Sequence, residues 1–73
     1  MQTNERKDMR ERFPMLTTAE LDVCRLVVQG LTLKEISITL GKSVSNVSTV
    51  RGNIRKKLGL EKDDDLKKTL LEK

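Results

Sequence analysis

The stretch LTLKEISITLGKSVSNVSTVRGNIRKKLG, residues 31–59, contains two helical patterns separated by a very short turn. Thr32 precedes the first pattern and Glu35 follows three residues later, which is the spacing of a capping box at a helix start. Gly41 ends this helix, and Ser43 is a good N-cap for a second helix at about residues 44–58. The stretch therefore predicts a tight helix-turn-helix, and this unit decides the fold.

The second helix of this unit has two different faces. At helical spacing Val47, Ile54 and Leu58 form one apolar stripe for the core, together with Val50. The opposite face is short, polar and free of carboxylates: Ser45, Ser48, Thr49 and Gly52. Lys56 also lies on that face and Arg55 at its edge, and these two, with Arg51 and Lys57, are the cations expected to flank the groove. The major groove of DNA, about 12 Å wide, admits such a helix, so we predict base contacts from the short residues and phosphate contacts from the basic ones.

The charge of the chain is concentrated in the same region. Residues 36–60 carry five basic and no acidic side chains, whereas the basic and acidic side chains of the other residues nearly cancel. Such one-sided charge indicates a polyanionic partner. Lys34, at the start of the preceding helix, is a further candidate phosphate contact, with an ordinary surface lysine as the alternative.

The tripeptide Gly41-Lys42-Ser43 also occurs in nucleotide-binding loops, but its surroundings exclude that function. Such a loop needs a glycine five residues before the Gly-Lys pair and must follow a strand. Here Ile36 occupies that position, inside a predicted helix. We therefore expect this turn to contact the phosphates of DNA and not those of a nucleotide.

The sequence offers no means of catalysis. It contains no His, and its one cysteine, Cys24, is expected to be a buried thiol between Val23 and Val27. We therefore predict that the protein is not an enzyme and has no metal or cofactor.

Two features of the unit leave alternatives open. Gly52 in a helix interior costs up to about 1 kcal/mol relative to Ala. Either its missing side chain allows closer approach to DNA, or a marginal helix tolerates it. Ile38 and Leu33 are expected to be partly exposed, either as a protein-contact patch or as scattered surface residues.

The rest of the chain completes an all-α domain of four helices. A first helix is capped by Thr17 with Glu20 and ends at Gly30. A last helix is capped by an aspartate in residues 63–65 and is expected to turn three leucines to the core: Leu66, Leu70 and Leu71. Residues 16–71 thus form the predicted DNA-binding domain, and residues 1–15 a linker or N-terminal extension, with a flexible tail as the alternative.

No apolar run reaches the roughly 20 residues of a membrane span, and no secretory signal is recognisable. The expected location is the cytoplasm. A membrane-surface helix is not expected either, because the apolar stripe lacks bulky aromatics and the core needs it.

Several motifs in these positions resemble the LuxR-type (GerE-like) helix-turn-helix of bacterial transcription regulators. They are Leu16-Thr17-x-x-Glu20, Gln29-Gly30-Leu31-Thr32-x-Lys34-Glu35-Ile36, Leu40-Gly41, Ser43-x-x-x-Val47 and Asn53-Ile54-x-x-Lys57-Leu58-Gly59. The resemblance covers about residues 16–71. It implies four helices, with the third in the major groove and the fourth contributing to a homodimer on DNA.

By position, the resemblance also implies site residues. It places base contacts on Ser48, Thr49 and Gly52, and backbone contacts on Lys34, Ser43, Asn46 and the basic end of the third helix. Lys42 stands where the family usually has an apolar residue and adds a phosphate contact. Many members have Lys or Glu in place of Ser48 and a longer side chain in place of Gly52, so we expect a different sequence specificity.

The expected function is therefore sequence-specific binding of double-stranded DNA as a homodimer, with control of transcription through contact with RNA polymerase. The alternative is a protein-interaction module that resembles the polymerase-docking region of a sigma factor, with the basic face on an acidic partner.

Overall fold

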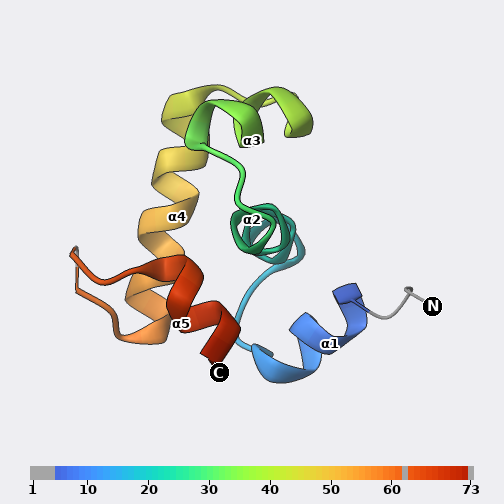
Figure 1. Cartoon of the computed structure of the whole chain (residues 1–73), viewed down its shortest axis with the longest axis vertical. Helices are drawn as coiled ribbons and strands as arrows, with labels where there is room; N and C mark the ends of the chain where they lie inside the picture. The colour runs from blue at the N-terminus through green and yellow to red at the C-terminus, as the bar shows by residue number, and fades with distance from the viewer. Residues whose placement is uncertain (1–4, 62, 73) are drawn as a thin grey trace.

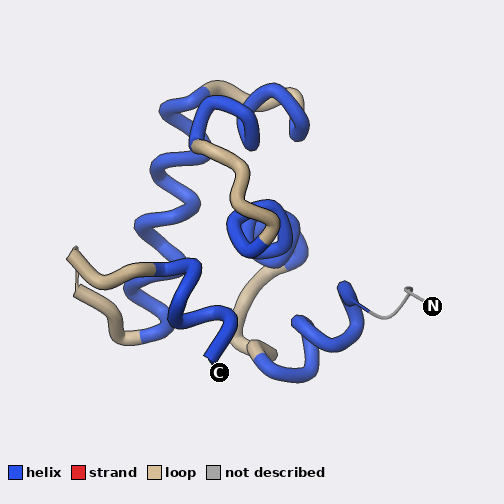
Figure 2. Tube along the Cα trace, viewed as in Figure 1, coloured by secondary structure: helices blue, strands red, loops and turns tan. Residues whose placement is uncertain are grey.

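The computed structural model describes residues 5–61 and 63–72, and this part of the chain contains five helices and no strand. They are α1 (Glu5–Arg12), α2 (Thr18–Val28), α3 (Leu33–Leu40), α4 (Val44–Leu58) and α5 (Leu66–Glu72). Figure 2 shows that short loops connect them. The predicted all-α class is confirmed, the four expected helices are α2 to α5, and α1 is additional.

Helix α2 is the centre of the domain. Figure 1 shows it end-on, with α3 above it, α4 to its left, and α5 and α1 below it, and it contacts all four. Its Leu21 and Cys24 are almost completely buried, as are Ile36 of α3, Ile54 of α4 and Leu70 of α5. The expected burial of Cys24 is confirmed, and this burial raises the pKa of the thiol to about 12. The core therefore holds α4 by its apolar stripe and leaves its other face outside.

The predicted helix starts are confirmed. At α2 the backbone N–H of Thr17 donates to Glu20 Oε1 over 2.8 Å, and the N–H of Glu20 donates to Thr17 Oγ1 over 3.1 Å. Thr32 and Glu35 form the same pair of hydrogen bonds at α3, over 2.8 and 3.2 Å. These boxes satisfy backbone donors that a helix start otherwise leaves unpaired.

Glycines end α3 and α4, as predicted, and both have the left-handed conformation: φ is 67° at Gly41 and 73° at Gly59. Gly52 differs, because it lies within α4 and nothing approaches within 4 Å of a Cβ placed on it. A side chain is therefore strained at Gly59 but not at Gly52.

We expect Gly59→Ala to lower the free energy of unfolding by about 1 kcal/mol, because L-residues avoid the left-handed region. The matched substitution Gly52→Ala should raise it by roughly 0.5–1 kcal/mol, because alanine favours the helix and meets no neighbour. Urea unfolding followed by circular dichroism measures both changes. Equal effects of the two substitutions would contradict the assigned backbone conformations.

Helix α1 contributes more to the core than the sequence indicated. Met9 and Phe13 are 4% and 2% exposed, and the Arg12 guanidinium lies 5.2 Å from the centre of the Phe13 ring. Arg12 also donates a hydrogen bond to the backbone oxygen of Leu70 in α5. Residues 1–4 of the expected linker or extension lie outside the described residues, and the division at residue 15 stays a prediction.

The prediction for the last helix is partly wrong. Leu66 and Leu70 are buried and Asp65 Oδ1 accepts from the N–H of Lys68, but Leu71 is 60% exposed. Leu66 and Leu70 lie one turn apart on one face, and the next residue lies about 100° around the helix. Leu71 therefore points away from the core.

Candidate nucleic-acid interface

The turn between α3 and α4 positions the start of α4. Gly41 reverses the chain, and the N–H of Lys42 donates to the backbone oxygen of Ser37 over 2.9 Å. Ser43 Oγ then accepts from the N–H of Asn46 over 3.0 Å, which confirms Ser43 as the N-cap of α4. Ile36, at the position where a nucleotide-binding loop needs glycine, is fully buried in α3. The unit is a helix-turn-helix and not a phosphate-binding loop of the nucleotide type.

The outer face of α4 is arranged as its sequence predicted. Ser45, Ser48 and Thr49 are exposed and Gly52 is half-buried, whereas Val47 on the other side is 1% exposed. Thr49 Oγ1 donates to the backbone oxygen of Ser45 over 3.1 Å, so its hydroxyl keeps acceptor capacity for a partner. Short side chains thus cover the outer face of α4 from Ser45 to Gly52.

An open hollow of about 360 Å³ lies on this face. It is lined by Ser48 and Gly52, by Arg55 and Lys56 from the next turn, and by Leu60 after the helix. Because Gly52 has no side chain and no neighbour near its Cβ position, the helix backbone itself forms part of the surface.

The predicted phosphate-binding cations fall into two groups. Lys34, Lys42 and Lys56 are exposed, and Arg51 and Arg55 are half-buried on α4. Burial and the nearby charge of Arg55 lower the pKa of Arg51 below its usual value. Within the described residues, the Nε atoms of both arginines are buried without a hydrogen-bond partner. These side chains carry donors that the rest of the described chain leaves unused.

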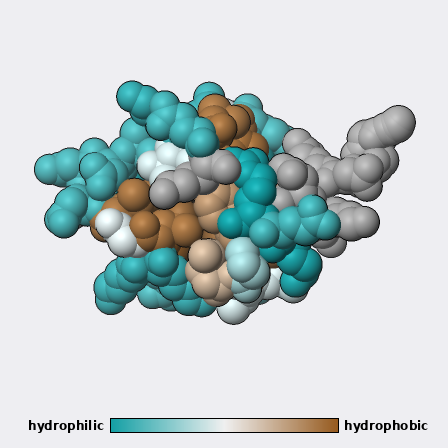
Figure 3. All heavy atoms as spheres, turned by 90° about the horizontal axis from the view of Figure 1, so that it is seen from below, coloured by the Kyte–Doolittle hydropathy of each residue, from teal (hydrophilic) through white to brown (hydrophobic). Residues whose placement is uncertain are grey.

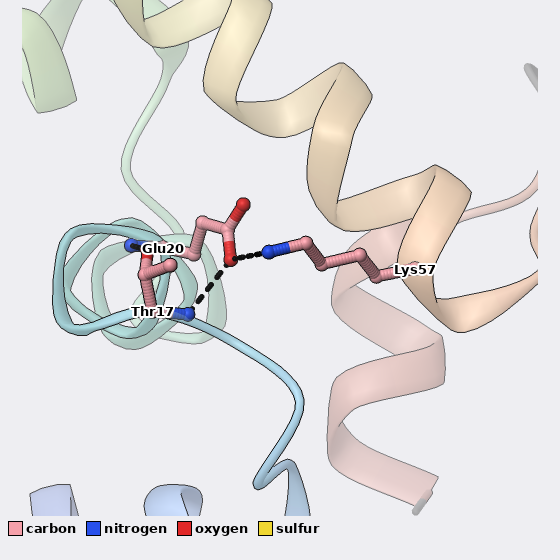
Figure 4. A network of polar contacts seen from close by, with 3 residues as sticks. All are labelled: Thr17, Glu20 and Lys57. Atoms are coloured by element: carbon pink, nitrogen blue, oxygen red, sulfur yellow. Dashed lines mark hydrogen bonds and ion pairs between the residues drawn. The ribbon is translucent and has the colours of Figure 1, made fainter.

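Lys57 differs from its basic neighbours. Its ammonium lies 2.8 Å from Glu20 Oε1, so the carboxylate that caps α2 also binds α4 (Figure 4). The Glu20 side chain is only 8% exposed and that of Lys57 is 38% exposed. Burial opposes ionisation of this carboxyl, but hydrogen bonds from Lys57 and Thr17 outweigh it and lower the pKa of Glu20.

The Glu20–Lys57 pair links residues 37 positions apart, and sequence reasoning missed it. Glu20 was recognised only as a cap, and Lys57 was grouped with the phosphate contacts. The available signal was the helical spacing of Glu20 from Val23, Cys24 and Val27, which places its carboxylate on their apolar face. The structure also adds Leu60, which the prediction left out, to the lining of the hollow.

Asn46 and Lys42 lie beside a second hollow, of about 300 Å³, between α4 and the start of α2. Thr18, Ala19 and Asp22 line its opposite wall. Both residues are exposed and lie at the start of α4, near its N-cap Ser43.

Two other kinds of site, a membrane span and a metal site, were also sought in the described residues. Within residues 5–61 and 63–72, no helix has the length and apolar character that crossing a lipid bilayer requires. The same residues contain no group of three or more His, Cys, Asp or Glu side chains that could hold a metal ion.

Comparison with known proteins adds one finding. The family model GerE, described as bacterial regulatory proteins, luxR family, matches residues 14–68. The match includes α2, α3, α4 and the start of α5, and it begins after α1. Neither the curated proteins nor the solved structures gave a match.

Proposed function

The chain belongs to the luxR family of bacterial regulatory proteins and so acts in DNA-binding transcription regulation, and we propose that α4 is the helix that enters the major groove. The observation that carries this proposal is the outer face of α4. It presents short side chains and a bare backbone at Gly52, and three bordering cations, Arg51, Arg55 and Lys56, form no ion pair with described residues. Such a face allows close approach to base edges while the cations bind phosphates.

The contacts divide by side chain. Ser45, Ser48, Thr49 and the backbone at Gly52 face the bases. The phosphates lie along the border, near Lys42, Ser43 and Asn46 at the start of α4, near Arg51 and Lys56 further along it, and near Lys34 at the start of α3. Lys57 contributes less than these, because its ammonium is bound to Glu20.

A domain of this size makes few contacts as a monomer, so we propose that two copies bind two half-sites about one helical turn of DNA apart. Leu71 on α5 is 60% exposed, next to buried Leu70. Figure 3 shows hydrophobic atoms at the surface seen from below, the side on which α1 and α5 lie in Figure 1. This surface suits a homodimer on DNA. Contact with RNA polymerase in the bacterial cytoplasm then completes the regulatory step.

The decisive experiment is selection of bound duplexes from a random DNA library by the 73-residue chain, followed by titrations at two salt concentrations. We expect an enriched sequence with two related half-sites and an affinity that falls steeply with salt. Recovery of unrelated sequences would contradict sequence-specific binding. A salt-independent affinity would contradict docking through the cations.

Replacing Ser48 or Thr49 with alanine should change which base is preferred at one position of each half-site. Both side chains are exposed, and a lost hydrogen bond to a base edge reduces discrimination by about 1 kcal/mol. Competition titrations with single-base variants of the selected duplex measure this change. An equal loss of affinity for every duplex would count against base contacts from these residues.

A further inference from the structure

Three residues on the outer face of α4 form one stripe, although two of them were assigned to base contacts and the third to phosphate contacts. Ser48, Gly52 and Arg55 follow each other at helical spacings of four and three residues, so they lie on one face over two turns. The structure confirms this grouping, because all three line the same open hollow with Lys56 and Leu60. Arg55 therefore lies at the end of the stripe that faces the bases.

Arg55 has unused hydrogen-bonding capacity. No hydrogen bond or ion pair with the described residues engages its guanidinium, and because the Nε is itself buried, the terminal nitrogens are the donors that a partner can reach. Arg51, one turn earlier, carries a like charge and cannot neutralise Arg55; burial, and then the charge of Arg55, lower the pKa of Arg51. An arginine in this setting lacks an acceptor until a partner enters the hollow.

The absence of a side chain at Gly52 leaves room for a long side chain and a base to meet beside the helix backbone. Nothing lies within 4 Å of a Cβ placed there, so a long side chain from the next turn can cross the space. A planar guanidinium presents donors in a fixed fork, and guanine presents two acceptors, O6 and N7, in the major groove at matching spacing. The ammonium of Lys56 is a point charge on the exposed border and suits a phosphate.

We propose that Arg55 reads a guanine across the hollow left by Gly52, so that its partner is a base and not a phosphate. The inference rests on the proposed docking of α4 in the major groove. The inference makes Arg55 a determinant of DNA sequence specificity, in addition to the short side chains of α4. Because Ser48 and Arg55 are about 10 Å apart along the helix axis, the guanine is a different base from the one that faces Ser48.

The test compares two charge-conserving variants of the 73-residue chain, Arg55→Lys and Lys56→Arg. Random-library selection with the unchanged chain first identifies any fixed guanine. Arg55→Lys keeps the charge but loses the fork, so we expect preference for that guanine to fall by about 5- to 100-fold while the salt dependence stays the same. Lys56→Arg should leave the base preference unaltered.

A second measurement uses 7-deazaguanine, which lacks the N7 acceptor, at the same position of the selected duplex. The unchanged chain should lose affinity for this duplex, whereas Arg55→Ala should bind both duplexes equally. Circular dichroism checks that Arg55→Ala keeps its helices.

The outcomes separate the inference from the proposed function. If the chain selects a sequence and Arg55→Ala retains every preference, the assignment of Arg55 is wrong and the docking of α4 still stands. If Arg55→Ala still discriminates against 7-deazaguanine, the assignment is also wrong. If the unchanged chain selects no sequence, or binds no duplex, both proposals fail.

Discussion

Replacement of Lys42, Arg51 and Lys56 by glutamine should weaken binding to every duplex by about 100-fold at about 100 mM salt. The three residues lie on the border of the α4 face and form no ion pair with described residues, so their charges are available to phosphates. Each phosphate contact releases counterions and contributes about 0.9 to the slope of log affinity against log salt. The slope should therefore fall by about 3, and titrations of selected and unrelated duplexes at several salt concentrations measure it.

The control for this experiment removes charge elsewhere. Lys67 and Lys68 are exposed on α5, which packs mainly on α2, so their replacement by glutamine changes the net charge without changing the α4 border. We expect a much smaller loss for each charge removed. If the α5 variant keeps the oligomeric state of the unchanged chain and loses as much affinity per charge as the α4 variant, binding follows net charge and the proposed docking face is wrong.

Much of the fold could be predicted because its signals are local. A capping box needs only Thr and Glu three residues apart, and both boxes are present as predicted. A left-handed helix end needs only a glycine, as at Gly41 and Gly59. The apolar stripe of α4 follows from helical spacing alone. These features require no knowledge of which helix lies beside which.

The features that were missed depend on packing between distant segments. Met9 in α1 and Phe13 directly after it are buried, and two apolar residues one turn apart are too weak a pattern to predict a core helix. Leu71 was assigned to the core because a run of leucines at the end of α5 does not itself show which one faces α2. The burial of Met9 and Phe13 and the exposure of Leu71 depend on tertiary contacts, which local sequence patterns do not show.

The same distinction applies to the candidate site. Which residues of α4 face outward could be predicted from the helix, but which cations are available could not. Lys56 and Lys57 are neighbours with the same chemistry, and only the position of α2 gives Lys57 a carboxylate partner. The hollow likewise requires Leu60, which lies beyond the end of the helix.

Lys57→Met should lower the free energy of unfolding at pH 7 by about 1–3 kcal/mol, whereas Lys56→Met should change it by less than about 0.5 kcal/mol. Removal of Lys57 leaves the Glu20 carboxylate, 8% exposed, without its cation. Loss of one partner from a fully buried pair costs about 3–5 kcal/mol, and the 38% exposure of Lys57 reduces that figure here. Urea unfolding of the two variants measures the difference.

The pH dependence identifies the cause of this loss. In the unchanged chain the pKa of Glu20 is lowered in the folded state, so its contribution is present above the ordinary carboxyl pKa, about 4.3, and is lost as the pH falls through the lower folded value. Without Lys57, burial acts against the ionised form and favours the protonated one. The difference between Lys57→Met and the unchanged chain should therefore be largest near pH 7 and become smaller below about pH 5.

A double substitution completes this test. Glu20→Gln in the Lys57→Met background removes the unpaired charge but keeps an oxygen that can accept from the N–H of Thr17. We expect it to recover part of the lost stability, because a neutral amide is less costly to bury than a lone carboxylate. If the second substitution instead adds its full loss to the first, the two side chains act independently and the pair does not hold α4 on α2.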